Sequence, residues 1–176
     1  MKQLISTKKI TLGGLFLALS LILPQVFHII GGPTAGKTFL PMHIPVLLAG
    51  FFAGPFIGAL TGLLAPLLSS LITGMPMPPI LYFMIFELGT YGLAAGYLFR
   101  QFKWNIYLSL ILSMLAGRAI NSLALLVAAG LMKLNVPPVM SVLTGIITGI
   151  PGLIIQVVLI PVVVYLVERR MKLDKN

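Results

Sequence analysis

The sequence has no cysteine, only three acidic residues and only two histidines in a length of 176 residues. A disulfide scaffold and a thiolate metal site are therefore both excluded. Charged residues make up 9% of the chain, against roughly 25% in an ordinary soluble domain. Too little polar surface remains to cover a soluble core of this composition in water. The few carboxylates and imidazoles also leave little material for acid–base catalysis.

Hydrophobic residues, by contrast, make up 59% of the chain, and the mean hydropathy is +1.09. A chain this apolar is not an intrinsically disordered one. The 12 lysines and arginines raise the net charge to +9, but they stand beside apolar runs and do not form a patch interleaved with aromatics. Anionic lipid headgroups and membrane topology explain them better. We therefore expect a protein embedded in a lipid bilayer, with no nucleic-acid partner.

Six apolar segments follow one another along the chain, and a membrane-spanning helix needs about 20 such residues. A transmembrane β-barrel would show alternating segments of about ten residues, and these runs do not alternate. The sequence thus predicts an all-α integral membrane protein, a compact bundle of six transmembrane helices that forms one domain over residues 1–176. We expect the first segment to be retained, because no small-residue cleavage site follows it. The predicted segments are residues 10–29, 39–53, 55–73, 79–99, 104–132 and 139–168.

Positive charge is distributed unevenly between the two sides of such a bundle. Six spans put both termini on one side, with nine lysines and arginines, whereas the opposite side has only Lys37 and Lys133. This bias predicts cytoplasmic N- and C-termini in a prokaryotic cell membrane. The connections that then face outward, residues 30–38, 74–78 and 133–138, are rich in glycine or proline. The nine residues are Lys2, Lys8, Lys9, Arg100, Lys103, Arg169, Arg170, Lys172 and Lys175.

Two ionisable residues, Glu87 and Arg118, fall inside the fourth and fifth predicted spans. Such groups are costly at membrane depth and usually face the protein interior or a water-filled cavity. Two interpretations stay open here: a structural ion pair, or side chains that line a ligand cavity. The two are compatible, because a buried pair can hold a cavity wall in place. Further polar side chains share the same helix faces at a spacing of three or four residues, namely Thr90 and Tyr91 after Glu87, and Asn121 and Ser122 after Arg118.

The sixth predicted span has small or polar residues at every fourth position. Small residues let membrane helices pack closely, so tight helix packing is one interpretation of this stripe. Gln156 is more suggestive of a site, because a primary amide in hydrocarbon needs a hydrogen-bonding partner. The stripe consists of Thr144, Thr148, Gly152 and Gln156.

The two histidines, His28 and His43, flank the first outward connection. Metal binding would need further ligands at fitted distances, and neither cysteine nor a nearby carboxylate supplies them, so we expect no metal site. His43 is better interpreted as a hydrogen-bonding or lid residue at the mouth of the bundle, and Lys37 as part of a lid over a ligand. The chain shows neither a glycine-rich phosphate loop nor a His-Glu-x-x-His motif, so we expect neither an enzyme nor a cofactor.

Several stretches together resemble the substrate-binding S component of energy-coupling factor (ECF) vitamin transporters. The resemblance covers essentially the whole chain and includes its six spans in fewer than 200 residues. The matching stretches are Lys8-Lys9 before a first helix rich in small residues, FLPMHIPVLLAGF at 39–51, FELGTYGL at 86–93 and AGR at 116–118.

This resemblance implies a binding subunit that captures a micronutrient from outside with high affinity and hydrolyses nothing itself. It implies association with an EcfT-like membrane coupling subunit and two cytoplasmic ATPase subunits. In that family an Ala-x-x-x-Ala pattern on the first helix docks on the coupling subunit, and the matching positions here are Gly14 and Ala18. The family's ligand lies near the outer face, enclosed by the loops after the first, third and fifth helices.

We expect the ligand to be a small vitamin or vitamin precursor. A buried arginine slightly favours a pantothenate-like acid, because its planar donors match a carboxylate or a phosphate. A pyridine or pyrimidine vitamin stacked on tyrosine or phenylalanine would fit nearly as well. If Glu87 and Arg118 neutralise each other, the site prefers a neutral ligand. Alternatives are an autonomous secondary transporter, which should show inverted repeats, and a membrane enzyme. The expected ligand-binding residues are Lys37, His43, Glu87, Tyr91, Arg118, Asn121 and Gln156.

Overall fold

The computed structural model describes residues 6–131, 133 and 136–173, apart from the side chains of residues 33 and 171–173. Within these ranges six helices are long and apolar enough to cross a membrane, which confirms the predicted all-α membrane bundle. The elements are α1 (Thr7–Phe39), α2 (His43–Ala53), α3 (Pro55–Thr73), α4 (Ile80–Gly96), the π-helical turn η1 (Tyr97–Gln101), α5 (Ile106–Gly130), α6 (Met140–Thr148) and α7 (Ile150–Leu173).

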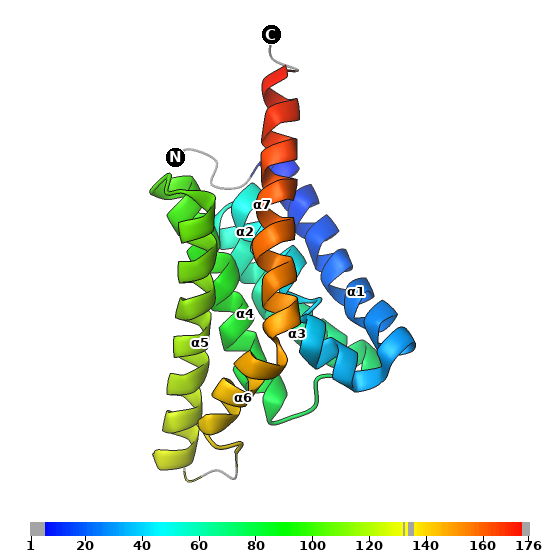
Figure 1. Cartoon of the computed structure of the whole chain (residues 1–176), viewed down its shortest axis with the longest axis vertical. Coiled ribbons are helices and arrows are strands. Elements are labelled where there is room, and N and C mark those ends of the chain that lie inside the picture. The colour runs from blue at the N-terminus through cyan, green and yellow to red at the C-terminus, as the bar shows by residue number, and fades with distance from the viewer. Residues whose placement is uncertain (1–5, 132, 134–135, 174–176) are drawn as a thin grey trace.

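The bundle has two distinct ends (Figure 1). At one end lie the start of α1, the end of α7 and the corners between α2 and α3 and between α4 and α5. We call this the terminal end. At the other end the chain passes from α1 to α2, from α3 to α4 and from α5 to α6. We call this the connection end.

α1 does not stop where the sequence predicts an outward loop. It continues as helix to Phe39, with one non-helical residue, Gly32, at φ 66° and ψ −168°. Glycine adopts this backbone conformation without a side-chain clash, so a single residue turns the helix back toward the bundle (Figure 1). The rings of Phe27 and Phe39 lie 5.2 Å apart across the turn and hold its two arms together. The prediction of a loop over residues 30–38 is therefore wrong.

The predicted sixth span is also interrupted. α6 ends at Thr148 and α7 begins at Ile150, with Gly149 between them. Pro151 explains the break, because its nitrogen has no hydrogen to donate to the preceding helical turn. A Cβ on Gly149 would lie 2.9 Å from Cδ1 of Leu40, so this residue also has to be small. The prediction of one continuous helix over residues 139–168 is wrong at this point, and α6 crosses the connection end as a separate helix (Figure 1).

α2, α3 and α4 pack through glycine. The backbones of Gly58 and Gly92 touch with no room for a Cβ on either residue, and Gly62 lies as closely against the backbone of Leu88. Gly50 of α2 packs against Gly92 as well. Small residues allow membrane helices this close approach, which maximises van der Waals contact where lipid offers no hydrophobic drive. These three helices thus form the most tightly joined part of the bundle.

Arg100 of η1 ties the end of α4 to α2 at the terminal end. Its Nε donates to the carbonyl oxygen of Phe51 at 2.8 Å, and its Nη2 donates to that of Phe52 at 2.6 Å. These are carbonyls of the last turn of α2, which have no partner within the helix and carry the negative end of its dipole. A guanidinium satisfies both carbonyls at once, so this arginine does more than add positive charge to its side.

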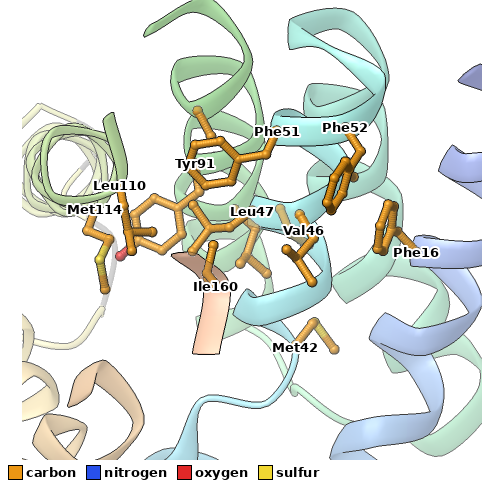
Figure 2. Close-up of a cluster of buried hydrophobic side chains, with 14 of the residues drawn as sticks. Phe16, Met42, Val46, Leu47, Phe51, Phe52, Tyr91, Leu110, Met114 and Ile160 are labelled. Carbon is orange, nitrogen blue, oxygen red and sulfur yellow. The ribbon is translucent and has the colours of Figure 1, made fainter. Parts of the chain in front are cut away.

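An apolar core fills the bundle between the glycine-packed helices and their neighbours. Phe16 of α1 stacks on Phe52 of α2 with ring centroids 5.9 Å apart. Figure 2 shows Tyr91 of α4 among Leu110 of α5 and Ile160 of α7. The core therefore joins α1, α2, α4, α5 and α7, and Tyr91 lies on the side of it next to α5 (Figure 2).

Candidate functional site

Glu87 of α4 is the centre of a polar cluster on the connection-end side of this core. Its side chain is buried, and three side chains donate to it. The hydroxyl of Tyr91, one turn along α4, donates to Oε1 at 2.8 Å. Nη1 of Arg118 lies 3.0 Å from the same oxygen, and Nδ2 of Asn121 donates to Oε2. The carboxylate is thus held by donors from two helices, α4 and α5.

The contact between Arg118 and Glu87 confirms the ion-pair interpretation, and it leaves the cavity interpretation open. The Arg118 side chain is 16% exposed, against 5% for that of Glu87. A guanidinium has five N–H donors, so one contact with Glu87 leaves others for a second partner. Gly145 of α6 lies over the guanidinium, because a Cβ there would stand 3.9 Å from Nη1. Arg118 therefore lies between Glu87 and the helix that crosses the connection end.

Gln156 of α7 lies at the same depth in the bundle as Glu87. Ile160 lies beside Tyr91 in the apolar core (Figure 2). α4 and α7 both run from the connection end to the terminal end (Figure 1). Gln156 precedes Ile160 by four residues, and Glu87 precedes Tyr91 by four. Because about four residues make a helical turn, each lies one turn nearer the connection end. The two side chains therefore lie at one level, on two helices that both pack against α2 and α5.

His43, the first residue of α2, completes this level. Its Nε2 lies 4.0 Å from Oε1 of Glu87, and its ring centroid lies 5.5 Å from that of Tyr91. The imidazole is buried. α2 packs against both α4 and α7, so His43 starts the helix that lies against the helices of Glu87 and Gln156. We call His43, Glu87, Arg118, Asn121 and Gln156 the polar cluster.

Four buried atoms of the polar cluster have no hydrogen-bond partner within the described part of the chain. They are Nδ1 of His43, Oδ1 of Asn121 and both amide atoms of Gln156, a residue with 0% exposure. Each such atom costs about 1–3 kcal/mol of folding free energy. Buried polar atoms in native proteins are normally paired, so a group of four at one level indicates a place for a polar ligand or ordered water.

Other polar residues of the predicted stripe do not reach this cluster. Thr148 is exposed and its hydroxyl donates to the carbonyl of Thr144 at 2.9 Å, within α6. Thr144 is exposed too and donates to Ser141 at 3.0 Å. The break at Gly149 separates these threonines from Gln156, so the prediction of one polar stripe is wrong. Lys37 is exposed on the returning arm of α1.

One functional feature was missed by sequence reasoning. A Cβ on Gly117 of α5 would overlap the ring of Tyr91, so only a glycine at this position leaves room for the tyrosine that donates to Glu87. The signal was present, because Gly117 directly precedes Arg118 and a glycine inside an apolar helix often marks close packing.

The surface of α4 and α5 also has an apolar groove of about 650 Å³, whose lining includes Tyr82, Phe86 and Leu123. Tyr82 and Phe86 are more than half exposed and face outward from the bundle, as in an interfacial aromatic belt. They do not form part of the polar cluster.

In the described part of the chain, no group of three or more His, Cys, Asp or Glu side chains is placed to hold a metal ion. Chemically the polar cluster offers one buried ion pair, several hydrogen-bond donors and acceptors, and an aromatic floor. This arrangement suits binding and orienting a small polar molecule.

The outer face of α1 is a second candidate surface. Gly14 and Ala18 are both exposed, and no described heavy atom lies within 4 Å of the place that a Cβ on Gly14 would take. The adjacent Gly13, by contrast, packs tightly against Ile57 of α3. The small residues at 14 and 18 therefore take no part in packing within the bundle, which leaves their face open to a partner helix.

Comparison with known families gives one match. The family model described as "ECF transporter, substrate-specific component" matches residues 8–164 of the 176. No curated protein and no solved structure matches the chain. The match takes in every residue of the polar cluster and both Gly14 and Ala18.

Proposed function

The chain belongs to the family of substrate-specific components of ECF transporters, and from this premise we propose that it captures a small vitamin or vitamin precursor from outside the cell. The observation that supports this proposal best is the group of four unpartnered, buried polar atoms on His43, Asn121 and Gln156. A structural ion pair alone would not need them. A bound polar ligand would pair them and recover the free energy that they cost.

The proposed orientation puts the polar cluster in the outer half of a prokaryotic cell membrane. The positive-inside bias favours a cytoplasmic terminal end, so the connection end faces outward. Glu87 stands seven residues into α4 from Ile80, about 10 Å along the helix axis. A ligand would therefore be held near the outer surface, under α6 and the returning arm of α1. Lys37 on that arm would lie at the entrance.

Each residue of the proposed site has a distinct role. His43 and Gln156 offer unpaired atoms to the ligand, and Asn121 offers its carbonyl oxygen because its amide nitrogen is engaged by Glu87. Arg118 offers the donors that Glu87 leaves free. Tyr91 forms the floor between the ligand and the apolar core.

Delivery is proposed to depend on partners. The face of α1 with Gly14 and Ala18 would dock on a membrane coupling subunit, which in turn associates with two ATPase subunits. The exposure of both residues supports this role, because small residues on a membrane-facing helix surface allow close approach of a second helix. An autonomous secondary transporter would need no such surface.

Mass spectrometry of small molecules released from the purified chain tests the binding function. We expect one vitamin-like compound in near-stoichiometric amount. His43→Leu should lose it, and the other histidine provides the control, because His28 packs on Gly36 outside the polar cluster. A His28→Leu chain should retain the compound. Equal retention by both variants would argue against the site.

Reconstitution tests the mode of transport. In liposomes with the coupling subunit and ATPases, uptake of the identified compound should require ATP. Uptake by the chain alone, driven by an ion gradient, would identify a secondary transporter in place of an ECF component.

A further inference from the structure

The charges on the walls of the polar cluster cancel. Glu87 contributes one negative charge, and Arg118 contributes one positive charge at a distance of 3.0 Å. Arg100 is bound to carbonyls of α2 at the terminal end. Lys37 is exposed and its charge is solvated at the surface. A ligand in the cluster therefore meets a pair that is already neutral.

The remaining hydrogen-bonding groups of the cluster are uncharged. Gln156 presents a donor, Nε2, and an acceptor, Oε1, side by side, and both are buried and unpartnered. Oδ1 of Asn121 adds an acceptor. Nδ1 of His43 adds one more neutral group, because the neighbouring carboxylate of Glu87 already pairs with Arg118 and would not balance a second buried cation. A primary amide can form two hydrogen bonds with another amide, because each presents a donor next to an acceptor.

We infer that the ligand carries no net charge and that it presents to Gln156 a neighbouring donor and acceptor, as a carboxamide, a lactam or a ring amide does. The inference rests on the proposed binding function and gives the chemical class of what is bound. It disfavours the pantothenate-like acid, which the sequence favoured only as long as Arg118 was unpaired.

The physical reason is the cost of an uncompensated charge in this place. An anionic ligand would have to share Arg118 with Glu87, which leaves one negative charge too many in a buried, low-dielectric site. A cationic ligand would share Glu87 with Arg118 and leave one positive charge too many. A neutral ligand lets Glu87 and Arg118 keep their contact and can still form hydrogen bonds with the unpartnered atoms.

The test uses the full chain, purified in detergent and washed free of retained small molecules. The probes are three fractions of a boiled, protein-free extract of the expressing cells, separated on ion-exchange resins at pH 7 into neutral, anionic and cationic pools. The readout is the thermal unfolding midpoint. We expect the neutral pool to raise it by about 5 °C or more at saturation, and the two charged pools to leave it unchanged.

The outcomes separate the inference from the function on which it rests. Stabilisation by the anionic or cationic pool, without the neutral one, would overturn the inference and leave the binding function intact. Stabilisation by none of the pools would overturn both. In Gln156→Met, at least tenfold more of the neutral pool should be needed for the half-maximal shift; an unchanged requirement would reject the amide contact.

A charge variant tests the role of the pair itself. Glu87→Gln leaves Arg118 without its anion, so the anionic pool should now stabilise this variant more than the neutral pool does. An unchanged preference for the neutral pool would overturn the claim that the pair sets the ligand's charge. The wild-type result decides the ligand's charge even where this variant fails to fold.

Discussion

The two ends of the bundle differ in how many buried polar atoms lack a hydrogen-bond partner among the described residues: Oγ of Ser109 is one near the terminal end of α5, whereas four gather in the polar cluster. At the terminal end Arg100 donates to two carbonyls of α2, and glycines at positions 58 and 92 bring backbones into contact. At the connection end two helices are broken, at Gly32 and Gly149, and buried atoms of the polar cluster have no partner in the described chain. Such mismatches destabilise a fold, and proteins keep them where a ligand needs them. The terminal end therefore contributes close packing to the fold, and the unpartnered atoms at the connection end support the proposed binding site.

Enlarging a glycine at the α3–α4 contact should have the largest effect. Gly92→Leu places a side chain where the backbone of Gly58 lies. Overpacking usually costs about 1–3 kcal/mol, and a backbone cannot move aside as a side chain can, so we expect no monodisperse protein after purification. Gly14→Leu is the control, because that position is open. Normal elution of the Gly92 variant on size exclusion would contradict the close packing.

Removing the cation of the buried pair should come next. Arg118→Met leaves Glu87 buried without its cation, and breaking such a pair costs about 3–5 kcal/mol. The double variant with Glu87→Gln should recover most of the loss, because no charge is then left unpaired. Thermal unfolding of the three chains measures this. A double variant as unstable as the single one would mean that Arg118 stabilises the fold through other contacts.

The contrast between the two ends also explains which helix bounds could be predicted from the sequence. α3 matches its predicted bounds, since Gly54-Pro55 and Gly74 mark both ends of an apolar run. The helical arm after Gly32 and the break at Gly149 were missed. The glycines and proline around residue 32 predicted a loop, and apolarity shows that a segment lies in the membrane but not where its helix is interrupted.

In the candidate site, too, some contacts could be predicted from the sequence and others could not. Spacing along α4 and α5 correctly grouped Glu87 with Tyr91 and Arg118 with Asn121, because residues three or four apart share a helix face. The contact between the two helices needed the fold. Arg100 was predicted only as a cytoplasmic charge, since the carbonyls that it binds belong to the backbone and leave no trace in the sequence.

Loss of the hydrogen bonds from Arg100 to α2 should have a moderate effect on stability and none on ligand binding. Arg100→Gln removes two charge-assisted hydrogen bonds to the end of α2. Arg100 is exposed, so we expect a loss of only about 1–2 kcal/mol, or a lower unfolding midpoint by about 2–8 °C. Affinity for the retained compound should stay within about twofold. A large drop in affinity would show that the two ends are coupled.

A change at Gln156 should raise the stability of the ligand-free chain, whereas the changes above lower it. Gln156→Met replaces two unpartnered amide atoms with an apolar side chain of similar length. Removing them should raise the stability of the ligand-free chain by about 1 kcal/mol or more, while ligand affinity falls at least about tenfold. Unfolding midpoints with and without ligand give both quantities. A less stable ligand-free variant would mean that the amide has a structural partner.

The smallest effect on the isolated chain is expected on the face of α1. Gly14→Trp adds bulk to an exposed position with no neighbour within 4 Å, so stability and ligand affinity should not change measurably. Transport by the reconstituted complex should nevertheless be lost, because a bulky side chain keeps the coupling subunit's helix from close approach. Leu126→Trp on the exposed face of α5 is the control and should leave transport intact. Loss of ligand binding in the Gly14 variant would mean that this face serves the fold and not a partner, which would remove α1 from the docking surface and leave the binding function at the connection end untouched.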